Sequence, residues 1–265
     1  MVKKIKGDLR VIGMSFEIEL RQNLTDGFVL FGIVIQPLIV AFMALWMLKD
    51  KGPDYAIFIV VGSAMTGLWT ALLFNSGNSI ISERWAGTLE TLVGTPSSLR
   101  VVVFGKVLAN IAQSLLSMIG CYTLISLVMG YPLTLSRPIF FLISILLTVL
   151  AFVGFGVIIA SLFILIPDFQ RLQNTLEFPM YILCGFLFPI ALLPDWTTPI
   201  SYILSPYWAA RALHGSALGG LEPNQIYISW VMLIFFSAIY IIGSSALYRL
   251  VLKRARVDAS LNRAG

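Results

Sequence analysis

Residues 138–166 read PIFFLISILLTVLAFVGFGVIIASLFILI and contain no charged side chain. The hydrocarbon core of a bilayer is about 30 Å thick, and a helix crosses it with about 20 apolar residues. This run is longer than that minimum, so it predicts a membrane-spanning helix. It also indicates the fold class, which is an all-α integral membrane protein.

The composition of the whole chain agrees with this class. Of the 265 residues, 58% are hydrophobic and only 12% are charged, and the mean hydropathy is +0.90. The net charge of +5 does not indicate a nucleic-acid partner, because the basic residues occupy the chain ends and short loops rather than one continuous polar face. Cys121 and Cys184 each lie inside an apolar run, where we expect them to be small packing residues.

Six apolar runs are long enough to span a membrane. The predicted spans are residues 28–48, 56–81, 101–129, 138–166, 176–193 and 226–252. The chain is therefore expected to form one transmembrane domain over residues 1–265, with a six-span bundle at 28–252 and a cytoplasmic tail at 253–265.

The basic residues set the orientation of these spans. If the N-terminus is cytoplasmic, the cytoplasmic basic residues are Lys3, Lys4, Lys6, Arg10, Arg21, Arg84, Arg100, Lys106, Arg171, Arg249, Lys253, Arg254, Arg256 and Arg263. The external ones are then Lys49, Lys51, Arg137 and Arg211. This orientation places fourteen basic residues on the cytoplasmic side and four outside, and such an excess favours cytoplasmic termini.

The N-terminal residues 1–27 predict an amphipathic helix at the cytoplasmic face. Leu9, Ile12, Phe16 and Leu20 recur at helical spacing, and the charged residues Lys6, Arg10, Glu17 and Arg21 lie elsewhere around the wheel. Such a helix can lie along the membrane surface. The alternative is a solvated lead-in to the first span. These residues mix acids and bases and lack the apolar core of a cleavable signal peptide.

A short polar segment, SERWAGTLETLVGTPSS at 82–98, separates the second and third predicted spans. On a helix over 83–95, one face carries Trp85, Leu89, Leu92 and Val93, and the opposite face carries Glu83, Gly87, Glu90 and Gly94. The two carboxylates between glycines give a flat surface that another protein can approach closely, and Pro96 ends the helix. We predict a cytoplasmic docking helix here; the alternative is a routine amphipathic connector.

The segment before the last predicted span is rich in proline and aromatic residues. It contains Pro194, Pro199 and Pro206, together with Trp196, Tyr202, Tyr207 and Trp208. Closely spaced prolines prevent one long helix, and Trp and Tyr favour the membrane interface. Two short helices that dip into the outer leaflet fit this pattern. Such backbone needs a covering of protein or a water-filled cavity, so the hairpin is expected near a transport path. The alternative is an ordinary external loop.

Two motifs resemble permeases of the ATP-binding-cassette (ABC) type-2 exporter family. ERWAGTLETLVGTPSSLRVVVFGKVL at 83–108 is similar to that family's segment after the second span. GFLFPIALLPDWTTPISYILSPYWAARAL at 185–213 is similar to its external re-entrant helices. The resemblance covers the chain in length, span count and element order. Cys184 departs from it, since many members have a serine there.

The resemblance implies a permease that pairs with itself or a sister chain and with two cytoplasmic ATPase subunits, in the inner membrane of a prokaryote. Its coupling-helix residues would be Glu83, Arg84, Gly87, Thr88, Glu90, Thr95 and Pro96. Its re-entrant or pathway residues would be Pro189, Pro194, Trp196, Pro206, Trp208 and Arg211. The implied substrate is amphipathic, lipid-linked, polysaccharide or drug-like, and export follows ATP-driven closure of the ATPases.

ATP and Mg²⁺ are expected on the partner rather than on this chain. A phosphate-binding loop requires Gly-x-x-x-x-Gly-Lys-Ser/Thr. The pair Gly105-Lys106 has Arg100 in place of the first glycine and Val107 in place of the hydroxyl. The chain is therefore predicted to be a non-catalytic subunit.

Two other classes of function remain open from the residues alone. A secondary transporter or channel would use ionisable groups within its spans, and Glu177 is the main candidate. Only two helical turns separate it from Arg171, which favours an interior or cytoplasmic-edge position over a proton relay. An intramembrane enzyme would use His214 near Arg211 and Ser216, but no acidic residue or second histidine completes that set.

Overall fold

The computed structural model describes residues 2–47, 53–75, 87, 99–129, 134–165 and 169–258, and the regular elements in these ranges are helical. The N-terminal half contains α1 (Val2–Thr25), α2 (Gly27–Leu30), the π-helix η1 (Phe31–Ile35), α3 (Gln36–Met47), α4 (Pro53–Thr70), the π-helix η3 (Ala71–Asn75) and α7 (Leu99–Met129). The C-terminal half contains α8 (Pro138–Leu165), α9 (Phe169–Leu183), the 3₁₀ turns η4 (Ile190–Leu192) and η5 (Asp195–Thr197), α10 (Thr198–Ile203), α11 (Ser205–Leu218) and α12 (Pro223–Asp258).

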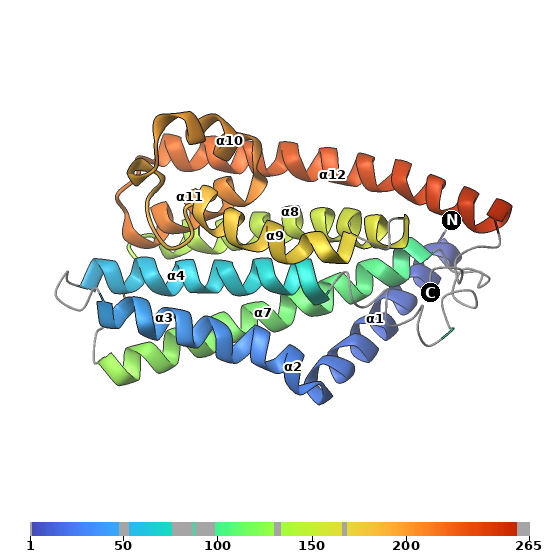
Figure 1. Ribbon diagram of the computed structural model, residues 1–265, viewed down its shortest axis with the longest axis horizontal. Coiled ribbons are helices and arrows are strands. Elements are labelled where there is room, and N and C mark those ends of the chain that lie inside the picture. The colour runs from blue at the N-terminus through green and yellow to red at the C-terminus, as the bar shows by residue number, and fades with distance from the viewer. Residues whose placement is uncertain are drawn as a thin grey trace.

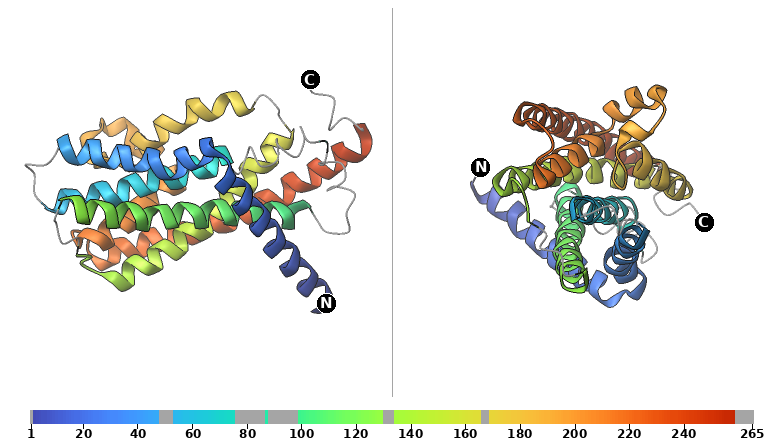
Figure 2. Two further views of the ribbon diagram at one scale, coloured as in Figure 1. Left: turned by 90° about the horizontal axis from the view of Figure 1, so that it is seen from below. Right: turned by 90° about the vertical axis from the view of Figure 1, so that its left-hand side faces the viewer.

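The long helices run roughly along the long axis of the molecule (Figure 1). The short helices α10 and α11 lie at one end, and α1 and the end of α12 lie at the other (Figure 1). The views in Figure 2 show α1 leaving the bundle obliquely. The described chain therefore has two distinct ends, one with the start of α1 and the end of α12 and one with the α10–α11 hairpin.

Four of the described helices are long and apolar enough to cross a membrane. These stretches are Tyr55–Phe74, Leu99–Gly120, Pro138–Leu162 and Pro223–Leu247. The first is 89% buried within the chain and the last only 22%, so α4 is central and α12 is peripheral. Peripheral apolar surface of this kind needs lipid or another protein to cover it. The prediction of a multi-span helical protein is confirmed, whereas the count of six spans stays a prediction.

The first and fifth predicted spans differ from the observed helices. Residues 28–48 were expected to form one regular span, but a π-helical turn, η1, interrupts the α-helix, and the apolar α-helical stretch is Gln36–Trp46. Residues 176–193 were also expected to be helical throughout. The observed helix, α9, begins earlier, at Phe169, and ends at Leu183.

The early end of α9 has a local cause. Gly185 adopts φ +69°, a left-handed conformation that glycine tolerates best. The Gly185 N–H donates to the Ile182 carbonyl at 3.2 Å, and the Phe186 N–H donates to the Tyr181 carbonyl at 3.2 Å. These bonds close the last turn in the manner of a glycine C-cap. Hydrophobicity alone does not reveal such a stop, because the residues after it are as apolar as those before.

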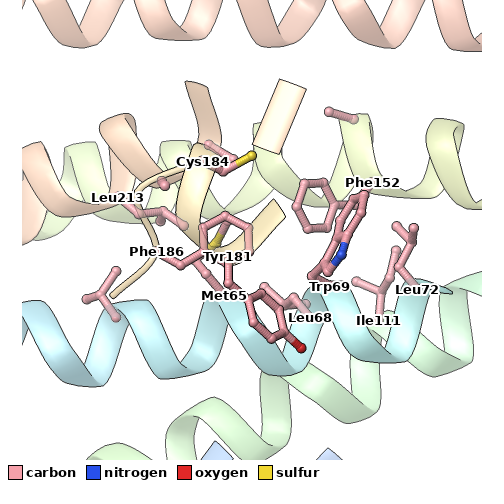
Figure 3. Packing of buried hydrophobic residues seen from close by; sticks show 14 of the residues in the cluster. Met65, Leu68, Trp69, Leu72, Ile111, Phe152, Tyr181, Cys184, Phe186 and Leu213 are labelled. Atoms are coloured by element: carbon pink, nitrogen blue, oxygen red, sulfur yellow. The ribbon is translucent and has the colours of Figure 1, made fainter. Parts of the chain in front are cut away.

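The core of the bundle forms around Trp69 on α4, which is 1% exposed. Its ring lies edge-on to Phe152 at 6.3 Å and stacks on Phe155 at 5.5 Å, so it joins α4 to α8. Figure 3 shows Trp69 and Phe152 facing each other, with Met65 and Leu68 further along α4 toward Phe186 and Tyr181. Cys184 is buried in the same cluster as a free thiol, which agrees with a packing role.

Candidate functional site

The predicted coupling residues Glu83, Arg84, Thr88, Glu90, Thr95 and Pro96 lie outside the described residues. Gly87 is described: it is exposed and lies in a turn with φ +68°. An α-helix has φ near −63°, so Gly87 does not have the backbone that a continuous helix over 83–95 requires. The coupling role of this segment stays a prediction.

The proline-rich segment at 192–224 contains short helical elements, and the predicted dip of two of them into the outer leaflet stays a prediction. Pro189 and Pro194 directly precede η4 and η5, and prolines occupy the first turn of both α10 and α11. Proline suits a first helical turn because backbone N–H groups in that turn have no acceptor within the helix, so proline removes no hydrogen bond there. These prolines therefore start four consecutive short elements.

The predicted pathway residues of this segment fall into two environments. Pro206 and Trp208 are buried, and the Trp208 indole N–H donates to the Tyr202 carbonyl at 2.9 Å, which ties α11 to α10. Pro189, Pro194 and Trp196 are exposed, and Trp196 is 71% exposed. Arg211 is half-buried, and its guanidinium lies 5.7 Å from the centre of the Trp208 ring. Trp208 and Arg211 thus come together, whereas Trp196 lies apart from them on the surface.

A cavity of about 340 Å³ lies between α4, the turn after α9, and the α10–α11 hairpin. Phe58, Tyr202, Tyr207, Arg211 and His214 form part of its wall. Its volume falls in the range of ligand pockets, which are mostly apolar with a few polar groups. Its lining elements α10 and α11 lie at the end of the bundle opposite the start of α1 (Figure 1), so the cavity is a candidate binding site at that end.

A second cavity, of about 470 Å³, lies between α4, α7 and α8. Val60, Leu115, Met118 and Phe141 contribute to its almost wholly apolar wall, and Tyr122 adds an aromatic ring. Such a wall accepts hydrocarbon and offers almost nothing to orient a polar group.

Glu177, the candidate carboxylate for a secondary transporter, is buried on α9. It accepts hydrogen bonds from the Thr70 hydroxyl at 2.8 Å and the Tyr181 hydroxyl at 2.5 Å. One turn away, the Gln173 side-chain amide donates to the Leu73 carbonyl at 2.5 Å, within the π-helix η3. Glu177 therefore faces the protein interior, as expected, and belongs to a polar link between α4 and α9.

A second polar contact joins α1 to α7. Glu19 and Lys106 form an ion pair at 3.1 Å, with side chains 4% and 3% exposed. The Asn23 side-chain amide donates to the side-chain oxygens of Asn110, at 2.6 Å, and Gln113, at 3.1 Å. We call this set the α1–α7 polar contact.

The close approach of these two helices depends on Gly105. A Cβ placed on this residue would lie 2.6 Å from the Ile12 carbonyl oxygen and 2.9 Å from the Ser15 Cβ. Both distances are shorter than van der Waals contact, so a larger residue would separate α1 from α7. The structure has a helix, α1, over most of the predicted N-terminal helix, and Leu9 on its apolar face is 61% exposed. Its position along the membrane surface stays a prediction.

The α1–α7 polar contact was not among the predicted sites, although the sequence contains a signal for it. Ser15, Glu19 and Asn23 recur every four residues on α1, and Lys106, Asn110 and Gln113 recur at four and three on α7. Such spacings place polar residues on one helix face. The predicted amphipathic helix was defined by its apolar face, and the polar stripe on α1 led to no prediction of a partner helix.

These features define a class, a polytopic helical membrane protein with a proline-broken helical hairpin at one end and buried polar contacts between its helices. Comparison with known sequences gives the family: the ABC-2 type transporter family profile matches residues 12–218. The chain belongs to that family.

Two curated relatives are similar to this chain. They are probable multidrug ABC transporter permeases named YbhS, from Escherichia coli strain K12 and from Escherichia coli O157:H7. Each is 26% identical over 191 residues, which cover 71% of this chain and 47% of the relative. The chain thus aligns with about half the length of the relatives it matches.

Proposed function

We propose that the chain is the membrane subunit of an ATP-driven ABC exporter, with six spans, cytoplasmic termini and a place in the inner membrane of a prokaryote. The family match over residues 12–218 carries this proposal. The excess of basic residues predicted on the cytoplasmic side supports the orientation. The position of α1 and the end of α12 at one end of the molecule agrees with it (Figure 1).

In this proposal a separate ATPase binds ATP and Mg²⁺, and two copies of it engage two permease chains that form a homodimer. Residues 82–98 contact the ATPase, and α1 braces that contact through its attachment to α7. The sequence Arg100 to Val107 does not form a phosphate-binding loop, which supports a separate ATPase. The chain itself supplies no catalytic group.

The proposed substrate is an amphipathic or lipid-linked molecule that moves from the cytoplasm or inner leaflet toward the α10–α11 end. The aromatic cavity there and the apolar cavity between α4, α7 and α8 support this class, since together they offer polar and hydrocarbon surroundings. The relatives named as probable multidrug permeases agree with a substrate of mixed polarity.

Purification from the native membrane tests the proposal. We expect a polypeptide with a phosphate-binding loop to co-purify in a one-to-one ratio with this chain, as measured by quantitative mass spectrometry. A known ABC transporter, isolated in the same way, checks that the procedure preserves such complexes. If the control stays intact and no ATPase accompanies this chain in repeated preparations, the proposal is wrong.

A charge reversal tests the contact with the ATPase. We expect Glu90→Lys to leave the chain inserted and ATP hydrolysis measurable while transport falls at least about tenfold, because in this proposal Glu90 faces a complementary charge on the ATPase, and reversing one member of such a pair costs several kcal/mol. The readout is substrate flux per ATP hydrolysed in proteoliposomes. Asp54→Lys, on the first turn of α4 and on the side predicted to be external, is the matched control. Unchanged coupling in Glu90→Lys would contradict the assignment of residues 82–98.

A further inference from the structure

Arg211 differs from the other half-buried arginines of the described chain in its hydrogen bonding. Arg100 donates to the Ser245 hydroxyl at 2.8 Å, and Arg137 donates to the Leu221 carbonyl at 2.8 Å. Among the described residues, the hydrogen-bond acceptor of the Arg211 guanidinium is the Tyr207 hydroxyl, at the long distance of 3.4 Å. Within the described ranges, the ion pairs join Arg21 to Glu17 and Lys106 to Glu19. The Arg211 guanidinium therefore retains donors without a strong acceptor in the described part of the chain.

His214, one turn further along α11, is 8% exposed and also has an unused polar atom. Its Nε2 lies 3.2 Å from the Phe186 carbonyl oxygen. A carbonyl only accepts, so Nε2 carries the hydrogen, and in the neutral ring Nδ1 is an acceptor. Nδ1 has no hydrogen-bond partner in the described structure. Nδ1 is itself buried, so a ligand in the cavity does not reach it, and the ring contributes an aromatic surface to the wall.

The two groups share one site. Arg211 and His214 both line the 340 Å³ cavity, and their i, i+3 spacing on α11 puts their Cβ atoms about 5–6 Å apart. The imidazole ring stacks on Phe58, with centroids 4.0 Å apart and planes inclined by 14°, which fixes its orientation. A ligand in the cavity can therefore contact both side chains.

We propose that this cavity binds the head of an anionic amphiphile, with a phosphate or carboxylate on Arg211 and the His214 ring beside it. Arginine matches the geometry of such oxyanions. The remaining wall, including Tyr202, Ile190 and Leu218, suits an apolar or ring-bearing body. This assignment rests on the proposed function, whose substrate class it narrows.

The test is a binding titration of the purified full-length chain with its native partners in lipid nanodiscs. The probe is oleoyl lysophosphatidic acid, which has a phosphate beside a free hydroxyl, and the comparison ligand is oleoyl lysophosphatidylcholine, whose head is zwitterionic. We expect the wild type to bind the anionic probe at least about tenfold more tightly. One hydrogen bond to a charged group contributes about 1.5–3 kcal/mol, which corresponds to about tenfold to a hundredfold in affinity.

Arg211→Gln should abolish this preference, and Arg211→Lys should retain part of it because the charge remains. Arg100→Gln removes a half-buried arginine at the other end of the bundle and should leave the preference intact. His214→Phe keeps an aromatic ring against Phe58 and should leave the preference intact, because the oxyanion is assigned to Arg211. Monodisperse elution of each variant checks that it is folded.

Competition with inorganic phosphate distinguishes recognition of the oxyanion alone from recognition of the whole amphiphile. Displacement of the probe by millimolar phosphate would assign recognition to the oxyanion alone; no displacement, with the preference for the anionic head intact, would assign it to the whole amphiphile. Equal binding of both lipids by the wild type would overturn the assignment, and so would equal losses in Arg211→Gln and Arg100→Gln. Binding needs no ATPase, so a chain that keeps this selectivity but lacks an ATPase partner would refute only the proposed function.

Discussion

Lys106→Met is expected to lower the free energy of unfolding by about 3–5 kcal/mol, because it leaves the buried Glu19 carboxylate without its ammonium partner. Both side chains of the ion pair are at most 4% exposed, so water cannot replace the lost partner without opening the contact between α1 and α7. Unfolding in detergent micelles, followed by circular dichroism, measures the change.

Two matched variants separate this effect from a general loss of charge. The double variant Glu19→Leu/Lys106→Met should recover most of the stability, since an apolar pair can replace a buried ion pair. Arg21→Met removes a surface pair whose side chains are 78% and 61% exposed, and it should cost less than about 1 kcal/mol. If Lys106→Met is as stable as the wild type, the buried ion pair does not hold α1 on α7.

Trp69→Ala is expected to cost about 3–5 kcal/mol, because it leaves a large cavity where α4 meets α8. Trp69 is 1% exposed and packs against the rings of Phe152 and Phe155. Its indole N–H has no hydrogen-bond partner in the described structure, so Trp69→Phe removes no such bond and should cost much less. Thermal unfolding of the purified variants in one detergent gives the comparison.

Trp196→Ala is the control for this prediction. Trp196 is 71% exposed, so its removal opens no cavity and should change the stability in detergent by less than about 0.5 kcal/mol. Similar losses in Trp69→Ala and Trp196→Ala would show that the packing around Trp69 is not the main source of stability in the core.

Much of the candidate hairpin site was predictable from local sequence. Pro194, Pro199 and Pro206 predict short helical elements, and the structure places an element at each. Proline acts through its own ring and its missing N–H, so its effect needs no knowledge of distant residues. Burial is different: Trp196 and Trp208 are equally aromatic in the sequence, yet only Trp208 packs inside.

The α1–α7 polar contact and the Glu177 link were harder to predict. Glu19 and Lys106 are 87 positions apart in the chain, and Thr70 and Glu177 are 107 apart. Each residue alone is an ordinary polar residue in or beside an apolar run. Only the packing of two helices supplies the partner that makes burial of such groups favourable.

The sequence by itself determined the class of the protein, its long apolar helices and the points where proline interrupts them. These properties follow from composition and from each residue's own backbone and hydration preferences, which act over one or two turns. The packing of the helices decided that α1 places a polar face on α7 and that Arg211 and His214 share a cavity with Phe58 and Tyr202. These outcomes depend on which helix faces meet, because a polar group inside an apolar bundle is stable only beside a partner that the fold brings to it.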